Sequence, residues 1–268
     1  MLFYLAPMEG ITGYIVRNAY AHYFPYIDKY FTPFIPAAKK MSKKIKRDLA
    51  AENNEQIRLV PQLIGNRADE FLMMIRQLEE LGFTSVNLNF GCPSGTVVSK
   101  RKGAGFLADP KELEMLLEEV LEKSPLAVSV KTRVGIKDPD EWEALEQIHV
   151  PLCYNGDICS VEDYKKVTAA FPAIDRIMIG RGLLENPGLV GEIKGNPPAD
   201  KARLRAFHDE ILEGCLDTFR AEKDVVFHLK EIWFYLTKSF PDREKYLKLI
   251  RKCQSLPEYK LIVQQIFS

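Results

Sequence analysis

Residues 87–94 read Asn-Leu-Asn-Phe-Gly-Cys-Pro-Ser and close the most informative β-type run in this 268-residue sequence. A buried strand seldom carries two asparagines two positions apart, because each side-chain amide needs hydrogen-bond partners. Since successive side chains point to opposite faces of a strand, Asn87 and Asn89 share a face. Gly91-Cys-Pro93 then holds a thiol on a rigid turn. The pattern predicts a strand that brings polar groups and Cys92 to one edge of a sheet.

Short β-type runs alternate with helical patterns on both sides of this stretch, which is typical of βα units and a parallel sheet. Each run ends in a loop rich in glycine, proline or polar residues. In a (β/α)8 barrel such loops gather on one face, and that face carries the chemistry. We therefore expect the α/β class and a TIM (β/α)8-type barrel. The expected strands are Leu2–Pro7, Tyr30–Ile35, Leu59–Ile64, Ser85–Phe90, Ala127–Val134, Val150–Asn155 and Arg176–Ile179, with helices that include Ala68–Leu81 and Pro110–Glu122.

These runs give seven strands, one fewer than a closed barrel of this type contains. The segment Gly135–His149 has room for only one short helix, at Glu141–Ile148. Either the barrel closes with seven strands, or one βα unit is missing near residues 136–149. We favour a unit that is absent only from this sequence, because a barrel without that strand would have two unpaired edges inside the domain.

The pattern changes after Pro198, where no further strand is expected. Asn196-Pro-Pro-Ala-Asp200 is typical of a linker, and Asp200 is a candidate helix N-cap. We predict two domains, a catalytic barrel over residues 1–195 and a small helical bundle over residues 196–268. The expected helices are Lys201–Arg220, Val225–Ser239, Arg243–Gln254 and Pro257–Phe267.

Composition narrows the class of protein. Hydrophobic residues make up 46% and charged residues 28% of the chain, and 37 basic residues balance 37 acidic ones. No apolar run approaches the length that spans a bilayer. The five cysteines show no paired spacing and no secretion signal precedes them, which favours the reducing cytoplasm. We expect a cytoplasmic, monomeric protein without a metal or a membrane partner.

A second motif pair follows the last two expected strands. Tyr154-Asn-Gly-Asp157 and Ile179-Gly-Arg-Gly182 lie where barrels often bind phosphate through glycine N–H groups and a helix N-terminus. Arg181 adds a bidentate phosphate partner. Either motif alone could be simple turn chemistry, but the two together favour a phosphate cradle.

Gln62 at the end of the third expected strand and Lys131 within the fifth complete a site large enough for a cofactor. A lysine in an apolar strand needs an anionic partner, which is either a ligand or a neighbouring carboxylate. Cys92 also has a structural interpretation, a small buried residue beside a turn. Its polar neighbours and the basic loop Lys100-Arg-Lys102 favour a functional one.

Together these motifs are similar to those of the tRNA-dihydrouridine synthase family, in the family's order and over residues 3 to about 190. The helical tail, with Leu229-Lys-Glu-Ile-Trp-Phe-Tyr-Leu236, resembles the family's C-terminal domain less specifically. The motifs are Leu5-Ala-Pro-Met-Glu-Gly10, Asn89-Phe-Gly-Cys-Pro93, Lys102-Gly-Ala-Gly105, Val130-Lys-Thr-Arg-Val-Gly135, Tyr154-Asn-Gly-Asp157 and Ile179-Gly-Arg-Gly182.

The resemblance implies an FMN-dependent reduction of a uridine in tRNA, with NADPH as the electron donor. Hydride would come from the flavin to C6 of the uracil, and Cys92 would be the general acid at C5. An ordinary thiol, with a pKa of about 8.5, is largely protonated at neutral pH and can donate. Asn89 would contact the uracil. The FMN-binding residues would be Pro7, Met8, Glu9, Gln62, Lys131, Asn155, Gly156, Asp157, Gly180 and Arg181.

A basic run marks a candidate surface for the RNA. Residues 39–47 contain six positive charges in nine positions and follow the second expected strand, at the catalytic face. Such a run is often only a solvated face, but beside an active site it suits a phosphate backbone. The target uridine would have to leave its stack to reach the flavin. The candidate substrate-binding residues, besides Asn89, are Lys39, Lys40, Lys43, Lys44, Lys100 and Arg101.

Two other functions compete with this one. An FMN barrel that acts on a free pyrimidine, such as a dihydroorotate or dihydropyrimidine dehydrogenase, would need neither the basic run nor the helical domain. A non-catalytic RNA-binding relative is the other alternative. The family also carries a histidine on a strand that this chain lacks, and His149 is either its remnant or an unrelated residue.

Overall fold

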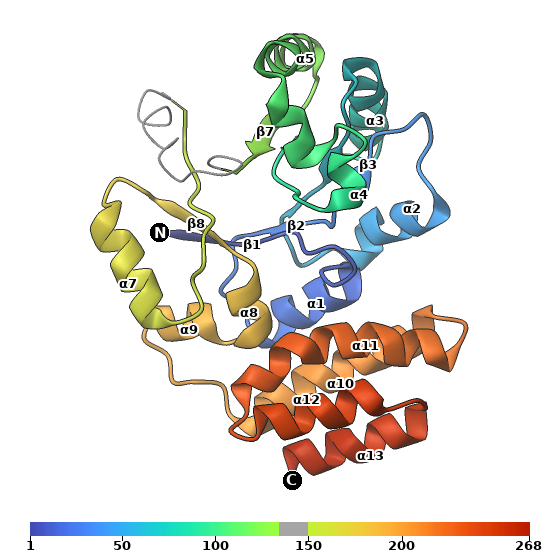
Figure 1. Ribbon diagram of the computed structural model, residues 1–268, viewed down its shortest axis with the longest axis vertical. Coiled ribbons are helices and arrows are strands. Elements are labelled where there is room, and N and C mark those ends of the chain that lie inside the picture. The colour runs from blue at the N-terminus through green and yellow to red at the C-terminus, as the bar shows by residue number, and fades with distance from the viewer. Residues whose placement is uncertain (134–149) are drawn as a thin grey trace. The chain divides into compact units, whose positions relative to one another are not determined.

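The structure is a computed structural model that describes residues 1–133 and 150–268 (Figure 1). The chain divides into two compact units. Unit 1 comprises Met1–Tyr30, Asn53–Arg58 and Leu152–Ser268, and unit 2 comprises Phe31–Glu52 and Leu59–Pro151. Within the described ranges, no helix is both long and apolar enough to cross a membrane.

Unit 1 is built around a parallel sheet in which β1 (Leu2–Leu5) lies between β2 (Lys29–Phe31) and β8 (Arg176–Ile179). The register pairs Tyr4 with Lys29 on one side and Leu5 with Ile179 on the other. Most residues of β1 and β8 are buried, as expected of parallel strands covered on both faces. The helices that accompany this sheet are α1 (Tyr14–Tyr23), α7 (Val161–Ala170), α8 (Arg181–Glu185) and α9 (Leu189–Ile193).

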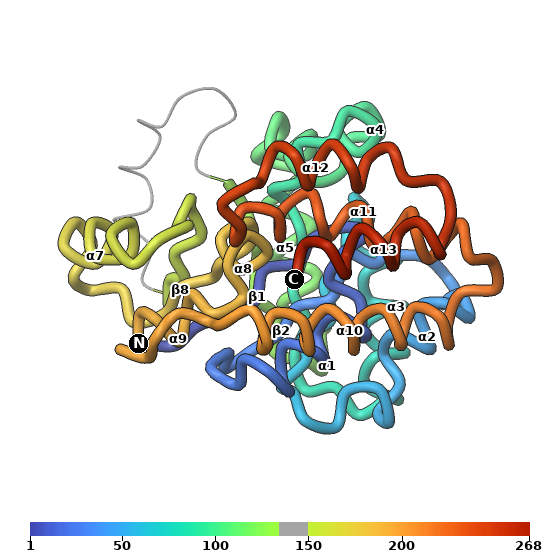
Figure 2. Tube along the Cα trace, turned by 90° about the horizontal axis from the view of Figure 1, so that it is seen from below, coloured from blue at the N-terminus to red at the C-terminus, as the bar shows by residue number. Residues whose placement is uncertain are grey.

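The C-terminal part of unit 1 is entirely helical apart from its connections, as the sequence predicts. Asp200 caps the first helix by accepting the backbone N–H of Arg203 at 2.7 Å. Aromatic side chains join this part to α1, where Tyr20 packs edge-on against Phe207 with ring centroids 4.9 Å apart. The α-helices of this part lie side by side in both Figure 1 and Figure 2. The helical elements are α10 (Lys201–Thr218), α11 (Glu222–Leu236), η4 (Thr237–Ser239), α12 (Arg243–Lys252) and α13 (Leu256–Phe267).

Unit 2 holds a second parallel sheet with the order β3-β5-β6-β7. Its core consists of large apolar side chains such as Phe71 and Leu78 from one helix and Leu88 and Phe90 from the sheet region. Asp109 caps a further helix by accepting the N–H of Glu112 at 3.1 Å. The strands are β3 (Ile35–Pro36), β4 (Leu59–Val60), β5 (Gln62–Ile64), β6 (Ser85–Asn89) and β7 (Ala127–Lys131), and the helices are α2 (Lys43–Leu49), η1 (Ala51–Asn53), α3 (Ala68–Glu80), α4 (Gly95–Val98), η2 (Gly103–Ala108) and α5 (Pro110–Lys123).

The predicted α/β class, parallel strands with helices followed by a helical C-terminal part, is confirmed. In two places the sequence predicts one long strand and the structure has a pair of short ones, because Pro33 and Pro61 interrupt them. Proline has no backbone N–H and cannot donate to a strand ladder. The predicted helix Glu141–Ile148, the missing βα unit and His149 lie outside the described residues.

The prediction of a strand over Val150–Asn155 is wrong. Only Tyr154 pairs there, as an isolated parallel bridge with Ile177. Its N–H donates to Arg176 at 3.1 Å, and its carbonyl accepts the N–H of Met178 at 2.8 Å. Pro151 removes a donor at the start of the segment, so an apolar run that resembles a strand has little capacity to pair.

Candidate active site

A row of buried amides crosses the sheet of unit 2 from the first residue of β5 to the last residues of β6. Gln62, which is 0% exposed, lies between two asparagines of the neighbouring strand. Its Nε2 donates to Asn87 Oδ1 at 2.7 Å, and its Oε1 accepts from Asn89 Nδ2 at 2.7 Å. Asn87 Nδ2 in turn donates to Ser129 Oγ of β7 at 2.9 Å. These bonds supply the partners that buried amides require, and they fix three strands of the sheet relative to one another.

The loop with Cys92 is attached to this row. Asn89 Oδ1 accepts the backbone N–H groups of Gly91 at 3.1 Å and Cys92 at 3.0 Å. On its other side, the Cys92 carbonyl accepts the N–H of Ala104 at 3.0 Å. Both backbone polar groups of Cys92 are therefore held, while its side chain is partly exposed and forms no disulfide. Such a fixed backbone presents the thiol in a defined position.

Gly103 explains why the motif at residues 102–105 belongs to the same loop. It adopts a positive φ of 54°, and a Cβ added there would lie 2.8 Å from the Cys92 carbonyl oxygen and 3.1 Å from its Cβ. A residue with a side chain would force the two segments apart, so glycine permits η2 to pack directly against the cysteine loop.

Lys131 ends β7 beside the amide row. It pairs in register with Asn89, and two residues earlier Ser129 pairs with Asn87. Because side chains alternate along a strand, Lys131 and Ser129 share one face of β7. The lysine is only partly buried. It contributes a cation at the strand end next to the asparagine that holds Cys92.

The candidate residues of unit 1 follow β1 and β8. The N–H of Ala6 donates to Ile179 at 2.9 Å, and that of Met8 donates to Thr12 Oγ1 at 2.8 Å, which shapes the turn that contains Pro7. A Cβ on Gly180 would lie 3.4 Å from both Ala6 Cβ and Met8 Sδ. The structure thus brings Met8 and Gly180 together. Glu9 lies next in this turn and is exposed.

The two glycine motifs of unit 1 are in contact. The Arg181 guanidinium forms an ion pair with the Asp157 carboxylate, and both side chains are exposed. Asn155 Nδ2 donates to the carbonyl of Met178 at 2.8 Å, which ties the first motif to β8. Gly156 lies against the ring of Tyr154, where a Cβ would come within 2.7 Å of Cζ.

This corner is suited to an anion. α8 begins at Arg181. The N–H groups of Leu183 and Leu184 donate to the Gly180 carbonyl, and those of Arg181 and Gly182 come before the first helical hydrogen bond. Such groups at a helix N-terminus bind phosphate, and Arg181 adds a guanidinium beside them. In the structure the Asp157 carboxylate is paired with the Arg181 guanidinium.

The basic candidate residues lie in unit 2. Lys39, Lys40, Lys43 and Lys44 are all exposed, and α2 begins at Lys43 with Ser42 as its cap. Two lysines in the first turn of a helix oppose the helix dipole, so local folding does not account for them. Lys100 is exposed as well.

Arg101 differs from these lysines. Its guanidinium contacts Glu112 at 2.6 Å and Asp109 at 3.4 Å, and its φ is 52°. It holds its own loop to the start of α5, which leaves it less available for a phosphate than Lys100.

The candidate residues therefore form two groups, one in each unit. Sequence reasoning missed Ser129, the partner of Asn87, and Ala104, the partner of Cys92. The spacing of Ser129 and Lys131 repeats the two-residue spacing of the asparagines and could have revealed the first. Among the described residues, no group of three or more His, Cys, Asp or Glu side chains could hold a metal.

Comparison with known proteins gives the family. The chain matches the dihydrouridine synthase (Dus) family over residues 4–147 and 137–265. The chain belongs to the dihydrouridine synthase family. The two matched segments overlap over residues 137–147, within the stretch near residues 136–149 where we predict a missing βα unit.

Curated relatives carry the same name. A tRNA-dihydrouridine(16) synthase of Pseudomonas syringae pv. tomato is 27% identical over 301 aligned positions, which cover 92% of this chain and 93% of that protein. One of Pseudomonas putida is 29% identical over 250 positions, covering 76% of this chain and 77% of that protein. Since 301 positions exceed the 268 residues of this chain, the first alignment contains gaps in this chain.

Solved structures resemble this chain only weakly. A variant of NCR from Zymomonas mobilis gives a TM-score of 0.48 at 13% identity, over 76% of this chain and 90% of that chain. N-acetylneuraminate lyase from Fusobacterium nucleatum gives 0.42 at 10% identity, over 99% and 96%. Both scores are too low to bear on the function of this dihydrouridine synthase family member.

Proposed function

We propose that this chain is a tRNA-dihydrouridine synthase that reduces the C5–C6 double bond of a uridine in tRNA, with FMN as its cofactor and NADPH as the reductant. Membership of the dihydrouridine synthase family supports the reaction. The observation that carries the chemistry is the Cys92 loop, which Asn89 and Ala104 hold at the end of a buried amide row.

The residues present fit FMN in two respects. Gln62 begins β5 and Lys131 ends β7 of the same sheet. They would offer an amide and a cation to the edge of a flavin ring, where the cation would favour the anionic reduced form. Pro7, Met8 and Glu9 would line the ring from the turn after β1. Gly180, Arg181 and the first N–H groups of α8 would hold the phosphate, with Asn155, Gly156 and Asp157 shaping that corner. Bound FMN would supply the hydride; the protein supplies position.

Cys92 would donate the proton to C5 of the uracil. A general acid must be held within hydrogen-bond reach of the atom it protonates. The fixed N–H and carbonyl of Cys92 leave only side-chain torsions free, which limits where the thiol can go. Asn89 would contact the uracil with the amide N–H that Gln62 does not use, so it would serve the substrate and the loop together.

The tRNA would be bound by Lys39, Lys40, Lys43, Lys44, Lys100 and Arg101 together with the C-terminal helices. We propose residues 1–195 as the catalytic domain and residues 196–268 as the RNA-binding domain. Since three of the curated relatives are named for position 16, uridine 16 is the position that we propose for this chain. The scattered cysteines favour a cytoplasmic protein, and we propose that it acts as a monomer without a metal.

The test uses the purified full-length chain with FMN, NADPH and tRNA that lacks dihydrouridine. Mass spectrometry of nuclease fragments should find a mass gain of two hydrogens at uridine 16. The same chain should leave free uracil and orotate unchanged. Reduction of the free bases at a rate similar to that of tRNA would favour a free-pyrimidine enzyme. A preparation that binds tRNA but has neither flavin absorbance nor activity would favour a non-catalytic relative.

A further inference from the structure

Helix α8 contains only five residues, from Arg181 to Glu185. One helical turn is not stable by itself in water, so its position depends on contacts from outside. Its first residue, Arg181, belongs to the phosphate-binding corner proposed above. Its C-terminal end faces the C-terminal helices, and the contacts made there decide where the whole helix lies.

Two hydroxyl groups satisfy the carbonyls at the C-terminal end of α8. The last carbonyls of any helix lack donors within the helix. Tyr20 OH, from α1, donates to the Leu183 carbonyl at 2.6 Å. Ser239 Oγ, from η4, donates to the Glu185 carbonyl at 2.6 Å. The end of α8 is therefore capped by side chains that are distant in sequence, one of them from the C-terminal helices.

The side chain of Glu185 adds a second contact with the same element. It is only 12% exposed, and a carboxylate at the C-terminal end of a helix is disfavoured by the helix dipole. The Lys238 ammonium forms an ion pair with it and offsets that effect. The nearby Cys159 is exposed, but partial desolvation together with the Glu185 carboxylate raises the pKa of its thiol.

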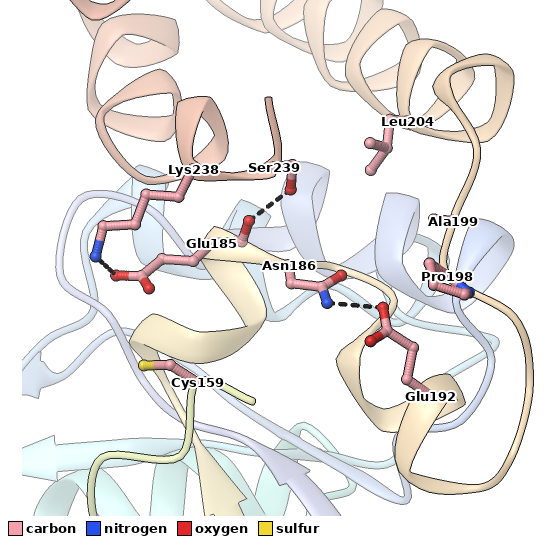
Figure 3. Close-up of a pocket in the computed structure, with 9 residues that line it drawn as sticks. All are labelled: Cys159, Glu185, Asn186, Glu192, Pro198, Ala199, Leu204, Lys238 and Ser239. Carbon is pink, nitrogen blue, oxygen red and sulfur yellow. Dashed lines mark hydrogen bonds and ion pairs between the residues drawn. The ribbon is translucent and has the colours of Figure 1, made fainter. Parts of the chain in front are cut away.

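Figure 3 shows this arrangement. Lys238 and Ser239 reach Glu185 from adjacent positions, beside a pocket of about 300 Å³ that Cys159 and Asn186 help to line. Adjacent residues of one short turn thus bind the side chain and the backbone of a single residue of α8.

We propose that Ser239 and Lys238 are positioning residues for Arg181 at the other end of α8, so that the C-terminal helices contribute to FMN retention. This inference rests on the proposed function. The two ends of α8 are about 7 Å apart, and Gly182 packs against the Ile158 carbonyl with no room for a Cβ. A helix this short and closely packed moves as one piece. Release of Glu185 therefore displaces Arg181.

The experiment compares FMN with riboflavin, which lacks the phosphate, in the full-length chain. Dissociation constants would be measured by quenching of flavin fluorescence. Ser239→Ala and Lys238→Met should each weaken FMN binding about three- to tenfold, which is the usual range for loss of one such contact. Riboflavin binding should not change. Ser239→Thr keeps the hydroxyl and should restore FMN affinity. Lys248→Met, on α12, is the matched control for the removal of a lysine.

Two further measurements test whether the effect passes through α8. Arg181→Ala should weaken FMN binding directly. Ser239→Ala should lower FMN affinity less in the Arg181→Ala background than in the wild type, because the effects of coupled residues are not additive. Hydrogen exchange without any flavin should be faster at the Asn186 amide, which donates to Gly182 at 2.9 Å in the wild type. The same peptide in Lys248→Met should exchange at the wild-type rate.

The outcomes separate the two proposals. If Arg181→Ala lowers the preference for FMN but Ser239→Ala and Lys238→Met do not, the positioning role is wrong and the cofactor site stands. Full additivity of Ser239→Ala and Arg181→Ala would also overturn the positioning role. If the wild type binds riboflavin as tightly as FMN, the phosphate corner and the inference both fail.

Discussion

Replacing Asn89 by alanine tests whether the buried amide row positions Cys92. Asn89 is 7% exposed and makes three hydrogen bonds, one to Gln62 and two from the backbone N–H groups of Gly91 and Cys92. The alanine variant loses all three and leaves Gln62 Oε1 buried without that donor. The lost bond to Gln62 leaves its Oε1 unsatisfied, which costs about 1–3 kcal/mol, and each of the two bonds from the partly exposed loop N–H groups contributes about 0.5 kcal/mol. We expect a total loss of about 2–4 kcal/mol.

That loss predicts a drop in the melting temperature of about 4–16 °C, at roughly 2–4 °C per kcal/mol for chains of this size. Product formation should fall more than stability suggests. Displacement of a catalytic group by about 1 Å can cost on the order of a hundredfold in rate. Single-turnover formation of dihydrouridine would be measured at about 20 °C with saturating FMN, well below either melting temperature. Reduction of the flavin by NADPH should be unchanged.

Asn87→Ala is the matched control. Asn87 is 3% exposed and lies in the same row, but its side chain bonds Gln62 and Ser129 and does not reach the cysteine loop. It should lose a similar amount of stability and keep most of its turnover. Equal single-turnover rates in the Asn87 and Asn89 variants would refute the positioning of Cys92 by Asn89.

Three further predictions follow from individual groups. Cys92→Ala should keep FMN and tRNA binding but lose most product formation, and wild-type turnover would refute its role as the acid. Replacing Lys43, Lys44 and Lys46 together by alanine should reduce the slope of log affinity for tRNA against log salt concentration by roughly two units. Each phosphate contact contributes about 0.9 to this slope for a duplex and about 0.7 for a single strand. An unchanged slope would show that the basic run is only a solvated face. Burial lowers the pKa of His208 below its ordinary value of 6.5, so the unfolded chain takes up a proton first as the pH falls. Stability from this group is therefore present above about pH 6.5 and lost below it; denaturant unfolding at pH 7.5 and 5.5 should show this loss in the wild type and not in His208→Gln.

Strong local signals account for the elements that the sequence predicts well. The strand Arg176–Ile179 is predicted with the bounds that the structure has. The helix beginning at Pro110 combines a capping aspartate, a proline at its first position and regular apolar spacing. Ala68–Glu80 has a similar apolar spacing. In each case the information lies within a few neighbouring residues.

Elements that depend on the rest of the fold escape prediction from the sequence. α8 and α9 have five residues each, too few for a periodic pattern to appear. α8 exists because Tyr20 and Ser239 cap it from positions far away in the sequence. The pairing capacity of residues 150–155 is overestimated for the opposite reason, since an apolar run indicates burial and not the presence of a partner strand.

In the candidate site, too, local patterns are predictable from the sequence and contacts between distant segments are not. The two-residue spacing predicts that Asn87 and Asn89 share a face, and the register with β7 agrees with this. Their link through Gln62 could not be predicted, because it depends on the register between β5 and β6, where Gln62 pairs with Asn87. The ion pair between Asp157 and Arg181 depends in the same way on how two loops approach each other.

Motif glycines illustrate what a sequence pattern does and does not say about a role. Gly103 and Gly182 belong to motifs that suggest ligand binding, yet each lies where another part of the backbone leaves no room for a side chain. Gly103 lies against the carbonyl of Cys92, and Gly182 lies against that of Ile158. Glycine is needed at both positions because another part of the backbone approaches closely. A motif of this kind therefore marks residues that hold a reactive group in place as well as residues that touch the reactants, and only the contacts separate the two.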